Sequence, residues 1–251
     1  MLSGGWEAMA AWYDDKQGDR GDLWHRALID PALLQVLGSV SGQRVLDLAC
    51  GNGYIARRLA GLRARVIGVD ASAPIIERAR AREAQAPLGI VYHVGDASHL
   101  DMLADRSVDV VVCNMALMDI ADAAAAIREV ARVLEPPGRF VASLSHPCFD
   151  VPNASAWLVE RMNFTTTVWR KVSRYREVFQ AWYPWSGPVE GWQTPAHHRP
   201  LAWYVRALRA AGFVITAFEE PFPTEEFLAE ASSGAWIAEI PLHCVFEARL
   251  G

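Results

Sequence analysis

The sequence has few of the features that mark a secreted, membrane-bound or metal-binding protein. Its four cysteines are scattered without a Cys-x-x-Cys pair, which argues against a disulfide framework and a zinc knuckle. No stretch approaches the roughly 20 apolar residues that span a bilayer. The N-terminus also lacks a basic segment followed by an apolar one. We therefore expect a cytoplasmic protein with reduced thiols and no membrane association.

Basic charge is also scarce. The 251 residues include 24 Lys and Arg against 29 Asp and Glu, which gives a formal net charge of −5, and no block of basic residues occurs. A protein that holds a phosphate backbone needs a positive patch, so we do not expect nucleic acid as a partner. Hydrophobic residues make up 52% of the chain, which is enough for a large buried core.

Short apolar runs alternate with helix-like segments from residue 44 to residue 145. Strands are predicted at 44–50, 64–70, 89–96, 108–115 and 138–145, and helices at 54–62, 72–86 and 122–135. We also expect Ser72 to cap the second of these helices and the Pro-Pro-Gly segment at 136–138 to form a turn. Strands that are apolar along their whole length belong to a sheet covered on both faces. The alternation therefore predicts the α/β class, with a doubly wound, mostly parallel, Rossmann-like sheet. A helix at 200–212 and strands at 213–220 and 242–250 follow later.

The repeat breaks between about 147 and 195, a segment in which Trp, Pro and Gly are interleaved. We predict a single domain over residues 1–251, in which 147–195 is an inserted lid over the substrate. Large aromatic rings exclude water and stack on flat or cationic molecules, so Trp182 and Trp192 are predicted to contact the substrate. Alternatively, these rings cover a sheet edge or bury a homodimer contact.

A glycine-rich turn follows the first predicted strand. Within VLDLACGNGYIARRLA, residues 51–56 fit the dinucleotide fingerprint G-x-G-x-x-[GA]. Such a turn presents backbone amides and the positive end of a helix to a ligand, but it serves several nucleoside cofactors alike and also occurs for packing alone. Asp47, Asp70 and Asp96 lie within or at the ends of three successive strands. Three acids there favour a cationic, ribose-bearing ligand without phosphates.

The order of several motifs resembles the class I S-adenosylmethionine-dependent methyltransferases, in particular the small-molecule group called methyltransferase type 11. These motifs are VLDLACGNG, GVDAS, VGDAS, VDVVVCNMAL, REVARVLEPPGRFVASL and HHRPLAWYVRALRAAGFVITAFEEP. The resemblance implies S-adenosylmethionine as cofactor and S-adenosylhomocysteine as product. It also implies a seven-stranded sheet with an antiparallel last strand, and an N-terminal helical lid at residues 1–43.

The same resemblance assigns cofactor contacts. Asp47 would place the amino group of the cofactor, Asp70 its ribose and Asp96 its adenine. The other implied contacts lie at the glycine turn, at the later strand ends and in the N-terminal lid: Ala49, Gly51, Gly53, Ala71, Ala97, Asn114 and Tyr13. Asn114 would contact the cofactor through its backbone.

A general base is needed in methyl transfer only when the acceptor carries a proton, because positioning supplies most of the acceleration. His146 follows the fifth strand at the carboxyl edge of the sheet and is the first candidate for base or substrate contact. A structural cap before Pro147 is the alternative. Tyr13 and His25, in the N-terminal lid, are the other catalytic candidates, against the alternative of a helix surface.

Two further residues are predicted to contact the substrate. Met118 follows the fourth strand, where core packing is the alternative. His197 lies beside His198, and in an extended segment their side chains point apart, so the pair cannot chelate one ion. No other metal-ligand pattern occurs, and we predict no metal.

The sequence therefore predicts a methyltransferase acting on O, N or C of a small aromatic or apolar molecule. One alternative is a cofactor-binding relative that catalyses elimination, cyclisation or decarboxylation. A ligand-binding module without activity is another. An NAD dehydrogenase is disfavoured because it does not explain Asp47.

Overall fold

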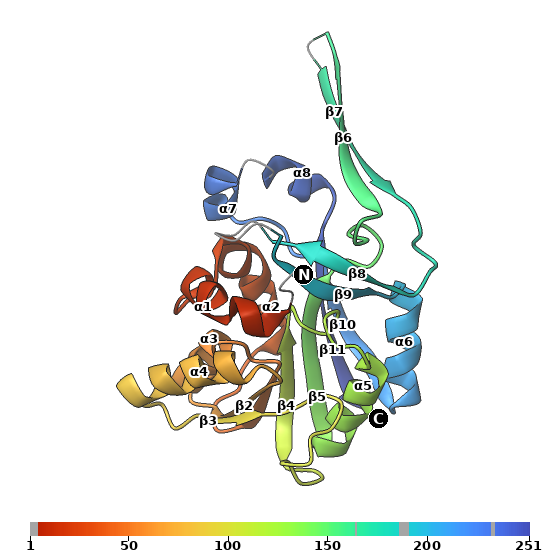
Figure 1. The fold of residues 1–251 in the computed structure, drawn as a ribbon. Coiled ribbons are helices and arrows are strands. Elements are labelled where there is room, and N and C mark those ends of the chain that lie inside the picture. Colours follow the sequence, from red (N-terminus) through yellow and green to blue (C-terminus); the bar gives the residue numbers. More distant parts are fainter. Residues whose placement is uncertain (1–4, 164, 186–190, 232–233) are drawn as a thin grey trace.

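A seven-stranded sheet forms the centre of the protein, which we describe from a computed structural model (Figure 1). The structure describes residues 5–163, 165–185, 191–231 and 234–251. Residues 1–4 of the expected N-terminal lid, and 164 and 186–190 of the expected insertion, lie outside the described residues. The parallel strands of the first half are β1 (Arg44–Leu48), β2 (Arg65–Asp70), β3 (Val91–Val94), β4 (Val108–Asn114) and β5 (Leu134–Ser145).

The last two strands complete the sheet on the other side of β5. They are β10 (Phe213–Glu219) and β11 (His243–Leu250), and the order across the sheet is β10-β11-β5-β4-β1-β2-β3. Strand β11 runs antiparallel to both of its neighbours, β5 and β10. The mostly parallel Rossmann-like sheet with an antiparallel last strand is thus confirmed.

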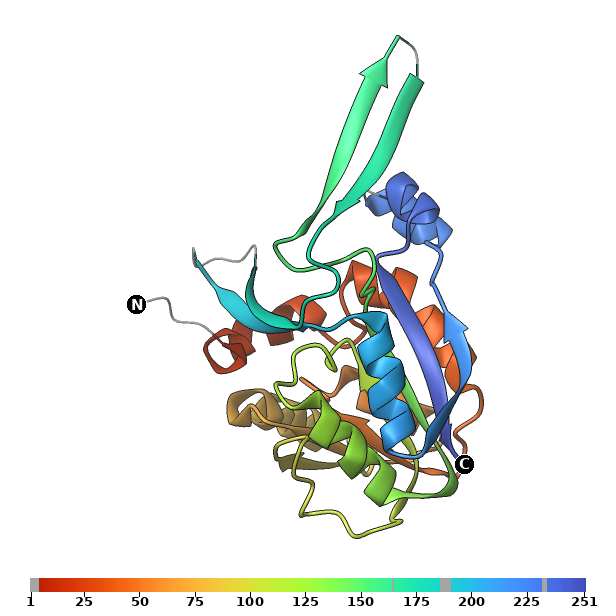
Figure 2. The ribbon, with the colours of Figure 1, turned by 90° about the vertical axis from the view of Figure 1, so that its right-hand side faces the viewer.

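Helices cover both faces of the sheet, so that the strands are buried along their length (Figure 2). Side chains of α2 (Asp30–Leu37), α3 (Tyr54–Gly61) and α4 (Ala73–Gln85) pack on one face, in a cluster that includes Leu33, Ile55 and Ile76. Side chains of α5 (Ala123–Val133) and α6 (Leu201–Ala210) pack on the other face. This burial on both faces is the reason that the strand sequences are apolar throughout and do not alternate.

Two local predictions need correction. The Pro-Pro-Gly segment at 136–138 was expected as a turn, but it lies inside β5, where the pairing with β4 jumps from Val108↔Leu134 to Val110↔Arg139 and leaves the extra residues as a bulge. Ser72 holds the N-cap position of α4, but its hydroxyl makes no cap hydrogen bond. Its N–H instead donates to Asp70 Oδ1 at 2.9 Å.

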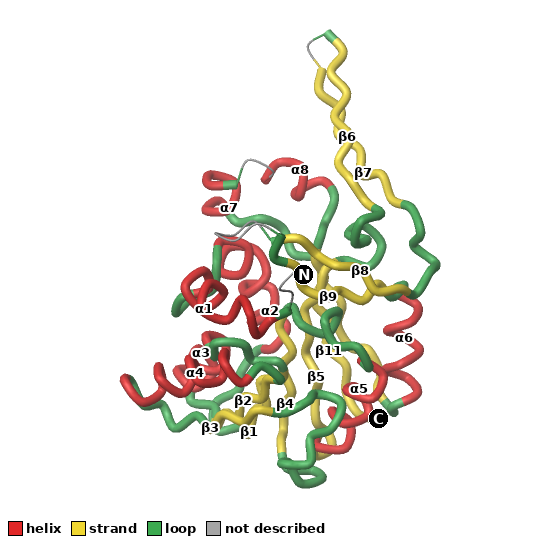
Figure 3. The backbone as a smooth tube through the Cα atoms, viewed as in Figure 1, coloured by secondary structure: helices red, strands yellow, loops and turns green. Residues whose placement is uncertain are grey.

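Two hairpins occupy the segment that interrupts the repeat. Strands β6 (Ser155–Met162) and β7 (Thr165–Val172) pair with each other and project far from the sheet (Figures 1 and 3). Strands β8 (Phe179–Pro184) and β9 (Gln193–His198) form the second hairpin. The N–H of His197 donates to the carbonyl of Met118 at 2.8 Å, which fixes β9 against the loop that follows β4.

Short helices enclose the same end of the molecule. The N-terminal helix α1 (Trp6–Gln17) is followed by a π-helical turn, η1 (His25–Ile29), that leads into α2. Helices α7 (Glu225–Glu230) and α8 (Gly234–Glu239) lie close together (Figure 3), and Phe227 and Ile237 pack with Leu28 of η1. Among the described residues, no helix has both the length and the apolar character needed to cross a membrane.

Candidate active site

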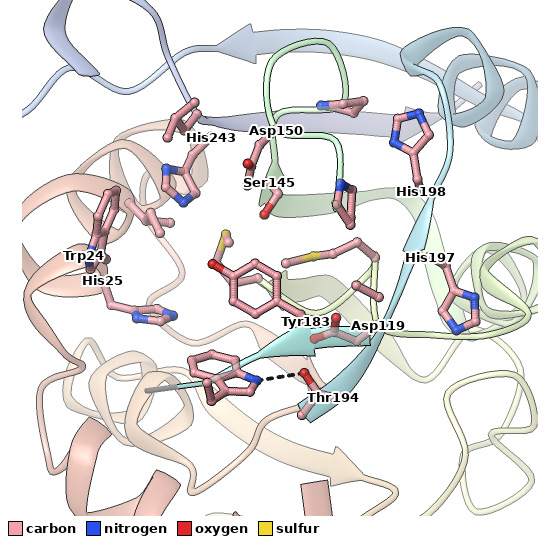
Figure 4. Close-up of a pocket in the computed structure, with 18 of the residues that line it drawn as sticks. Trp24, His25, Asp119, Ser145, Asp150, Tyr183, Thr194, His197, His198 and His243 are labelled. Atoms are coloured by element: carbon pink, nitrogen blue, oxygen red, sulfur yellow. Dashed lines mark hydrogen bonds between the residues drawn. The ribbon is translucent and has the colours of Figure 1, made fainter. Parts of the chain in front are cut away.

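Two adjoining cavities lie at the end of the sheet where β1 and β4 finish. The larger has a volume of about 500 Å³ and is bounded by α1, η1, the loop after β4 and the β8–β9 hairpin (Figure 4). The smaller lies against the glycine-rich turn and is lined by Asp47, Ala49, Gly51 and Asn114, among others. Tyr13 and His25 line both cavities. These two side chains therefore lie where the contents of the two cavities would meet.

The glycine turn after β1 depends on residues without a side chain. Gly51 and Gly53 have φ angles of 55° and 80°, a region that favours glycine. A Cβ atom on Gly53 would also lie 2.3 Å from Tyr92 Oη, closer than any real contact. Helix α3 begins immediately afterwards, at Tyr54. The turn thus brings bare backbone and the positive end of a helix to the floor of the smaller cavity.

Asp47 is a buried carboxyl group that lacks a charge partner. It lies in β1 with 1% of its surface exposed, and its Oδ2 accepts no hydrogen bond from any described residue. Burial, followed by the nearby charges of Asp70 and Asp30, raises the pKa of Asp47 to about 8. Such an orphaned acceptor on the wall of a cavity fits a ligand that brings a cationic N–H donor.

Asp70 and Asp96 stand at the ends of neighbouring strands. Asp70 Oδ2 accepts the N–H of Gly51 at 2.9 Å, so the carboxylate is fixed beside the glycine turn, and each oxygen keeps a further lone pair. Burial raises the pKa of Asp70. Asp96 Oδ1 accepts from the N–H and hydroxyl of Ser98, which holds the pKa of Asp96 below its usual range. Five residues for which a cofactor contact was predicted do not line the smaller cavity: Gly53, Asp70, Ala71, Asp96 and Ala97.

The side chain of Asn114 is occupied within the protein. Its Nδ2 donates to Tyr54 Oη at 2.7 Å and to Asp30 Oδ1 at 3.3 Å, and its Oδ1 accepts the hydroxyl of Ser143. Asn114 nevertheless lines the smaller cavity. A contact with a ligand would therefore come mainly through its backbone, in keeping with the prediction made from the sequence.

His25 forms a dyad with Asp22. Asp22 Oδ1 accepts the backbone N–H of His25 at 3.1 Å, and the same oxygen lies 2.7 Å from Nδ1 of the imidazole ring. Asp22 therefore caps the helical turn and also orients the imidazole. Burial disfavours the charge on Asp22, but the hydrogen bond and charge of His25 and the charge of Lys16 outweigh it and hold the pKa of Asp22 well below its usual range. Since an ionised carboxylate only accepts, the proton of the neutral ring sits on Nδ1, and Nε2 keeps a free lone pair.

Helix α1 is held over the site by a polar anchor and an aromatic one. Asp14 accepts from Asn52 Nδ2 at 2.9 Å and pairs with Arg82 of α4 at 2.7 Å. On the other side, Trp6 packs edge-on against Trp185, with ring centroids 5.6 Å apart. Helix α1 therefore bridges the glycine turn and the β8–β9 hairpin.

His146 lies outside both cavities. It is 2% exposed, its Nε2 meets Glu220 Oε1 at 2.8 Å, and its Nδ1 accepts the N–H of Cys148 at 3.1 Å. Burial lowers the pKa of His146 in spite of Glu220. With both ring nitrogens engaged, this histidine joins the end of β5 to the segment after β10, which corresponds to the structural alternative and not to the base expected from sequence.

The predicted substrate contacts divide into two groups. Met118 and His197 line the larger cavity, as does Tyr13. Trp182 and Trp192 do not: Trp182 is 48% exposed, and Trp192 packs against Trp12 of α1. Their neighbours Tyr183 and Trp185 line the cavity instead. Trp182 and Tyr183 are neighbours in β8, and successive side chains of a strand point to opposite faces, so Tyr183 faces the cavity and Trp182 does not.

Several lining residues were not singled out from the sequence. Asp22 lies three positions before His25, a spacing that suits a cap and a ring contact, and this pattern was the one available signal. Asp119 follows Met118 in the loop after β4 and also faces the larger cavity (Figure 4). Among the described residues, no three His, Cys, Asp or Glu side chains gather in a way that would hold a metal ion.

Comparison with known proteins identifies the family. A family model described as "Methyltransferase domain" matches residues 39–190. An S-adenosylmethionine-dependent methyltransferase from Mesorhizobium loti has the same fold, with a TM-score of 0.72 and 30% identity over 87% of this chain and 96% of that one. The chain belongs to the S-adenosylmethionine-dependent methyltransferases. S-adenosylmethionine is therefore the cofactor of this methyltransferase, in agreement with the orphaned acceptor of Asp47 and the glycine turn.

Curated relatives are also methyltransferases. An uncharacterised methyltransferase from Mycobacterium bovis is 30% identical over 74% of this chain and 87% of its own length. A protein named ubiquinone biosynthesis O-methyltransferase, from Sodalis glossinidius, is 30% identical over 61% of this chain and 60% of its own length. The chain spans only 34% to 60% of the length of five curated relatives, the Sodalis glossinidius protein among them.

Proposed function

We propose that this methyltransferase transfers the methyl group of S-adenosylmethionine to a proton-bearing oxygen or nitrogen of a small molecule bound in the larger cavity. The observation that carries the proposal is the His25–Asp22 dyad, whose histidine lines both cavities. A cavity of about 500 Å³ suits a small molecule. The ubiquinone O-methyltransferase relative, by its name, also acts on oxygen.

The smaller cavity and the strand ends beside it would hold the cofactor. Asp47 would accept from its amino group, the backbone of the glycine turn would face its methionine part, and Asp70 would accept from its ribose. Asp96, with the backbone of Ala97, is proposed for the adenine. When bound, the cofactor supplies an electrophilic methyl group on a positively charged sulfur.

His25 is the proposed general base. Asp22 keeps the proton of the neutral imidazole on Nδ1, so Nε2 is free to take a proton from the acceptor as the acceptor oxygen or nitrogen becomes a nucleophile. Asp22 also stabilises the imidazolium that results, because the same carboxylate then faces a full positive charge at 2.7 Å. Tyr13, with which His25 shares both cavities, would position the reacting groups and is not proposed as a base, because burial raises its pKa far above neutrality.

The aromatic walls would exclude water. Trp6, Tyr13, Trp24, Tyr183 and Trp185 all line the larger cavity, and they come from α1, the turn before η1 and the β8–β9 hairpin. A dry cavity strengthens the interaction between His25 and Asp22 and favours near-attack contact over hydrolysis. We propose that the described parts of the predicted lids at 1–43 and 147–195 build this enclosure in a single domain, mainly through α1, η1 and the β8–β9 hairpin.

The proposal is tested by mass spectrometry with S-adenosylmethionine and a panel of phenols, amines and carboxylic acids. We expect a panel member to gain one methylene in mass while S-adenosylhomocysteine appears. On that acceptor, His25→Gln should lower turnover by about a hundredfold or more and leave S-adenosylhomocysteine affinity intact. Asp22→Asn should lower turnover as well, because Asn no longer fixes the tautomer.

His93→Gln is the matched control, since His93 lies in the edge strand β3 and lines neither cavity. Equal turnover of the wild type and His25→Gln would remove His25 as base. Tight binding of S-adenosylhomocysteine without methylation of any class of acceptor would instead favour elimination, cyclisation or decarboxylation.

A further inference from the structure

The larger cavity contains a carboxyl group, that of Asp119, that takes no part in the proposed proton transfer. Asp119 lies in the loop that follows β4, where its N–H donates to the carbonyl of Ala116 at 2.8 Å and closes a tight turn. The neighbouring Met118 carbonyl accepts from His197 of β9, so the loop is fixed from both sides. The Asp119 side chain lines the cavity and points into it (Figure 4). It is therefore a rigidly presented group.

The charges around the cavity leave Asp119 without a counter-ion. Asp22 is paired with His25 and Lys16, and Asp150 is paired with Arg170 at 2.8 Å. The guanidinium of Arg199, which also lines the cavity, donates to the carbonyls of Ile120 and Ala121, keeps a buried Nη1 without a partner among the described residues, and forms no salt bridge with Asp119. Within the described part of the chain, Asp119 forms no salt bridge and no side-chain hydrogen bond. Three carboxyl groups line the cavity, and Asp22 and Asp150 already have cationic partners within the protein. The charge of Asp119 is therefore left for a ligand to neutralise.

The walls of the cavity are suited to positive charge. The Nζ of Lys16 lies 4.7 Å from the ring centroid of Trp185 and 5.2 Å from that of Trp12, so the aromatic surface formed by α1 and the β8–β9 hairpin already holds one cation of the protein. Tyr13, Tyr183 and Tyr204 add further ring surface to the same cavity. An organic cation would find both π-faces and an unpaired carboxylate there.

We propose that Asp119 is the counter-ion for a positively charged nitrogen of the acceptor, so that this methyltransferase acts on aromatic or apolar amines. This inference rests on the proposed function, because it names the substrate class of the same cavity. The cation need not be the methylated atom: an ammonium group held at Asp119 orients the molecule, and His25 acts on the group that faces the smaller cavity. Neutral and anionic molecules of the same shape leave Asp119 unpaired and bind less tightly.

The direction of the pKa shift of Asp119 agrees with this geometry. Burial, with a smaller contribution from the charge of Asp70, raises the pKa of Asp119 well above its usual range. An isolated carboxylate in a closed aromatic cavity is unfavourable, and a bound cation relieves that penalty. The raised pKa of Asp119 and its lack of a counter-ion therefore have one physical origin, the burial of the carboxyl group without a cationic partner.

Two probes of equal size test the proposal: phenethylammonium and 2-phenylethanol, which differ in charge but share the ring and the chain length. Each is titrated into the protein saturated with S-adenosylhomocysteine, and tryptophan fluorescence and calorimetry report binding. We expect the ammonium probe to bind at least about tenfold more tightly than the alcohol. Asp119→Asn, which keeps size and removes charge, should abolish that preference by weakening the ammonium probe alone.

Asp122→Asn is the matched control, because Asp122 is exposed and caps α5 through the N–H of Ala125, a role that Asn fulfils equally well. It should keep the full preference for the cation. If Asp119→Asn does not fold, Asp119→Ser serves the same purpose, and the melting temperature of each complex verifies folding.

Three results would overturn the inference: no saturable binding of the ammonium probe, equal binding of the two probes, or an unchanged preference in Asp119→Asn. A loss of S-adenosylhomocysteine affinity in Asp119→Asn would also overturn it, because Asp119 would then belong to the cofactor site. Failure of the proposed function looks different, since it appears as absent methylation of any acceptor while the charge preference persists.

Discussion

At the scale of single residues, the buried aspartates around the site differ in the hydrogen-bond donors and cations that offset the cost of burying a carboxylate. Asp14 has Asn52 and two arginines, and Asp22 has His25 and Lys16. Asp47 has no such partner, and one of its oxygens accepts no hydrogen bond from the described residues. A buried carboxyl oxygen without a hydrogen-bond donor destabilises the folded state. A ligand that supplies this donor explains why the protein has an aspartate at this position.

The burial of Asp47 predicts how stability depends on pH. Its pKa is about 8 in the folded protein, against an ordinary value of about 3.9, so the folded state keeps a proton that the unfolded chain has already released. Stability therefore falls as the pH rises between these two values. We expect Asp47→Asn to lack this contribution and to gain about 3 kcal/mol relative to the wild type between about pH 5 and pH 7.5.

Urea unfolding of both proteins without cofactor, at several pH values, measures this difference. The comparison cancels the titration of other groups, such as His243, whose burial lowers its pKa to about 3. A difference between the two proteins that stays constant with pH would mean that Asp47 is ionised in the folded protein.

Residues in a local motif were predictable, and residues that meet across the fold were not. The glycine turn, Asp47 and Asp70 follow from strand ends and a turn within about 25 consecutive positions. His146 was preferred over His25 because it lies nearer a strand end, but the sequence could not show that Glu220 and Cys148 occupy both of its nitrogens. Asp119 was missed because its significance lies in the absence of a partner, which only the assembled cavity reveals.

At the scale of elements, enclosure of the cavity depends on α1 and the β8–β9 hairpin meeting face to face. Trp185 is the centre of this contact: its ring packs near Trp6, Trp12 and Tyr13, and its Nε1 donates to Thr194 Oγ1 at 2.8 Å. It also lines the cavity. One side chain thus joins the two segments and forms part of the wall.

Trp185→Ala should therefore open the cavity on one side. We expect binding of phenethylammonium to the S-adenosylhomocysteine complex to weaken by about 1 to 3 kcal/mol, the range typical of a buried aromatic anchor. Cofactor affinity should change little, because Trp185 does not line the smaller cavity. Calorimetry measures both constants.

Trp169→Ala is the control for this experiment, since Trp169 is 54% exposed on the projecting β6–β7 hairpin. If the two variants have the same effect on binding, the aromatic contact around Trp185 does not form the acceptor wall.

The regular elements followed from the sequence more closely than the hairpins did. Helix α3 begins at Tyr54 and ends at Gly61, against a predicted 54–62, because its apolar spacing and glycine start are local signals. The β6–β7 hairpin was not predicted. Its exposed strands mix Thr, Arg, Lys and Trp on both faces, so neither the period of a helix nor a clean alternation appears in the sequence.

At the scale of the whole molecule, cofactor binding should be visible as thermal stabilisation. S-adenosylhomocysteine at about a hundred times its dissociation constant adds about 2.7 kcal/mol to the folded state. For a chain of this size we expect the melting temperature to rise by about 5 to 10 °C. NAD should give no increase, because its pyrophosphate would meet the carboxyl group of Asp47 at the glycine turn. A scanning fluorimetry comparison of the two ligands decides this, and stabilisation by NAD would count against the assigned cofactor.

The position of β11 sets the order in which the sheet becomes complete during synthesis. This strand lies between β5 and β10. In the described sheet, β10 pairs with β11 alone. Until residues 243–250 leave the ribosome, β5 presents an open edge and β10 has no ladder to join. An open, apolar edge is a template for pairing between nascent chains. Residues 243–250 therefore cover an apolar edge of β5 that the growing polypeptide would otherwise expose to pairing with other chains.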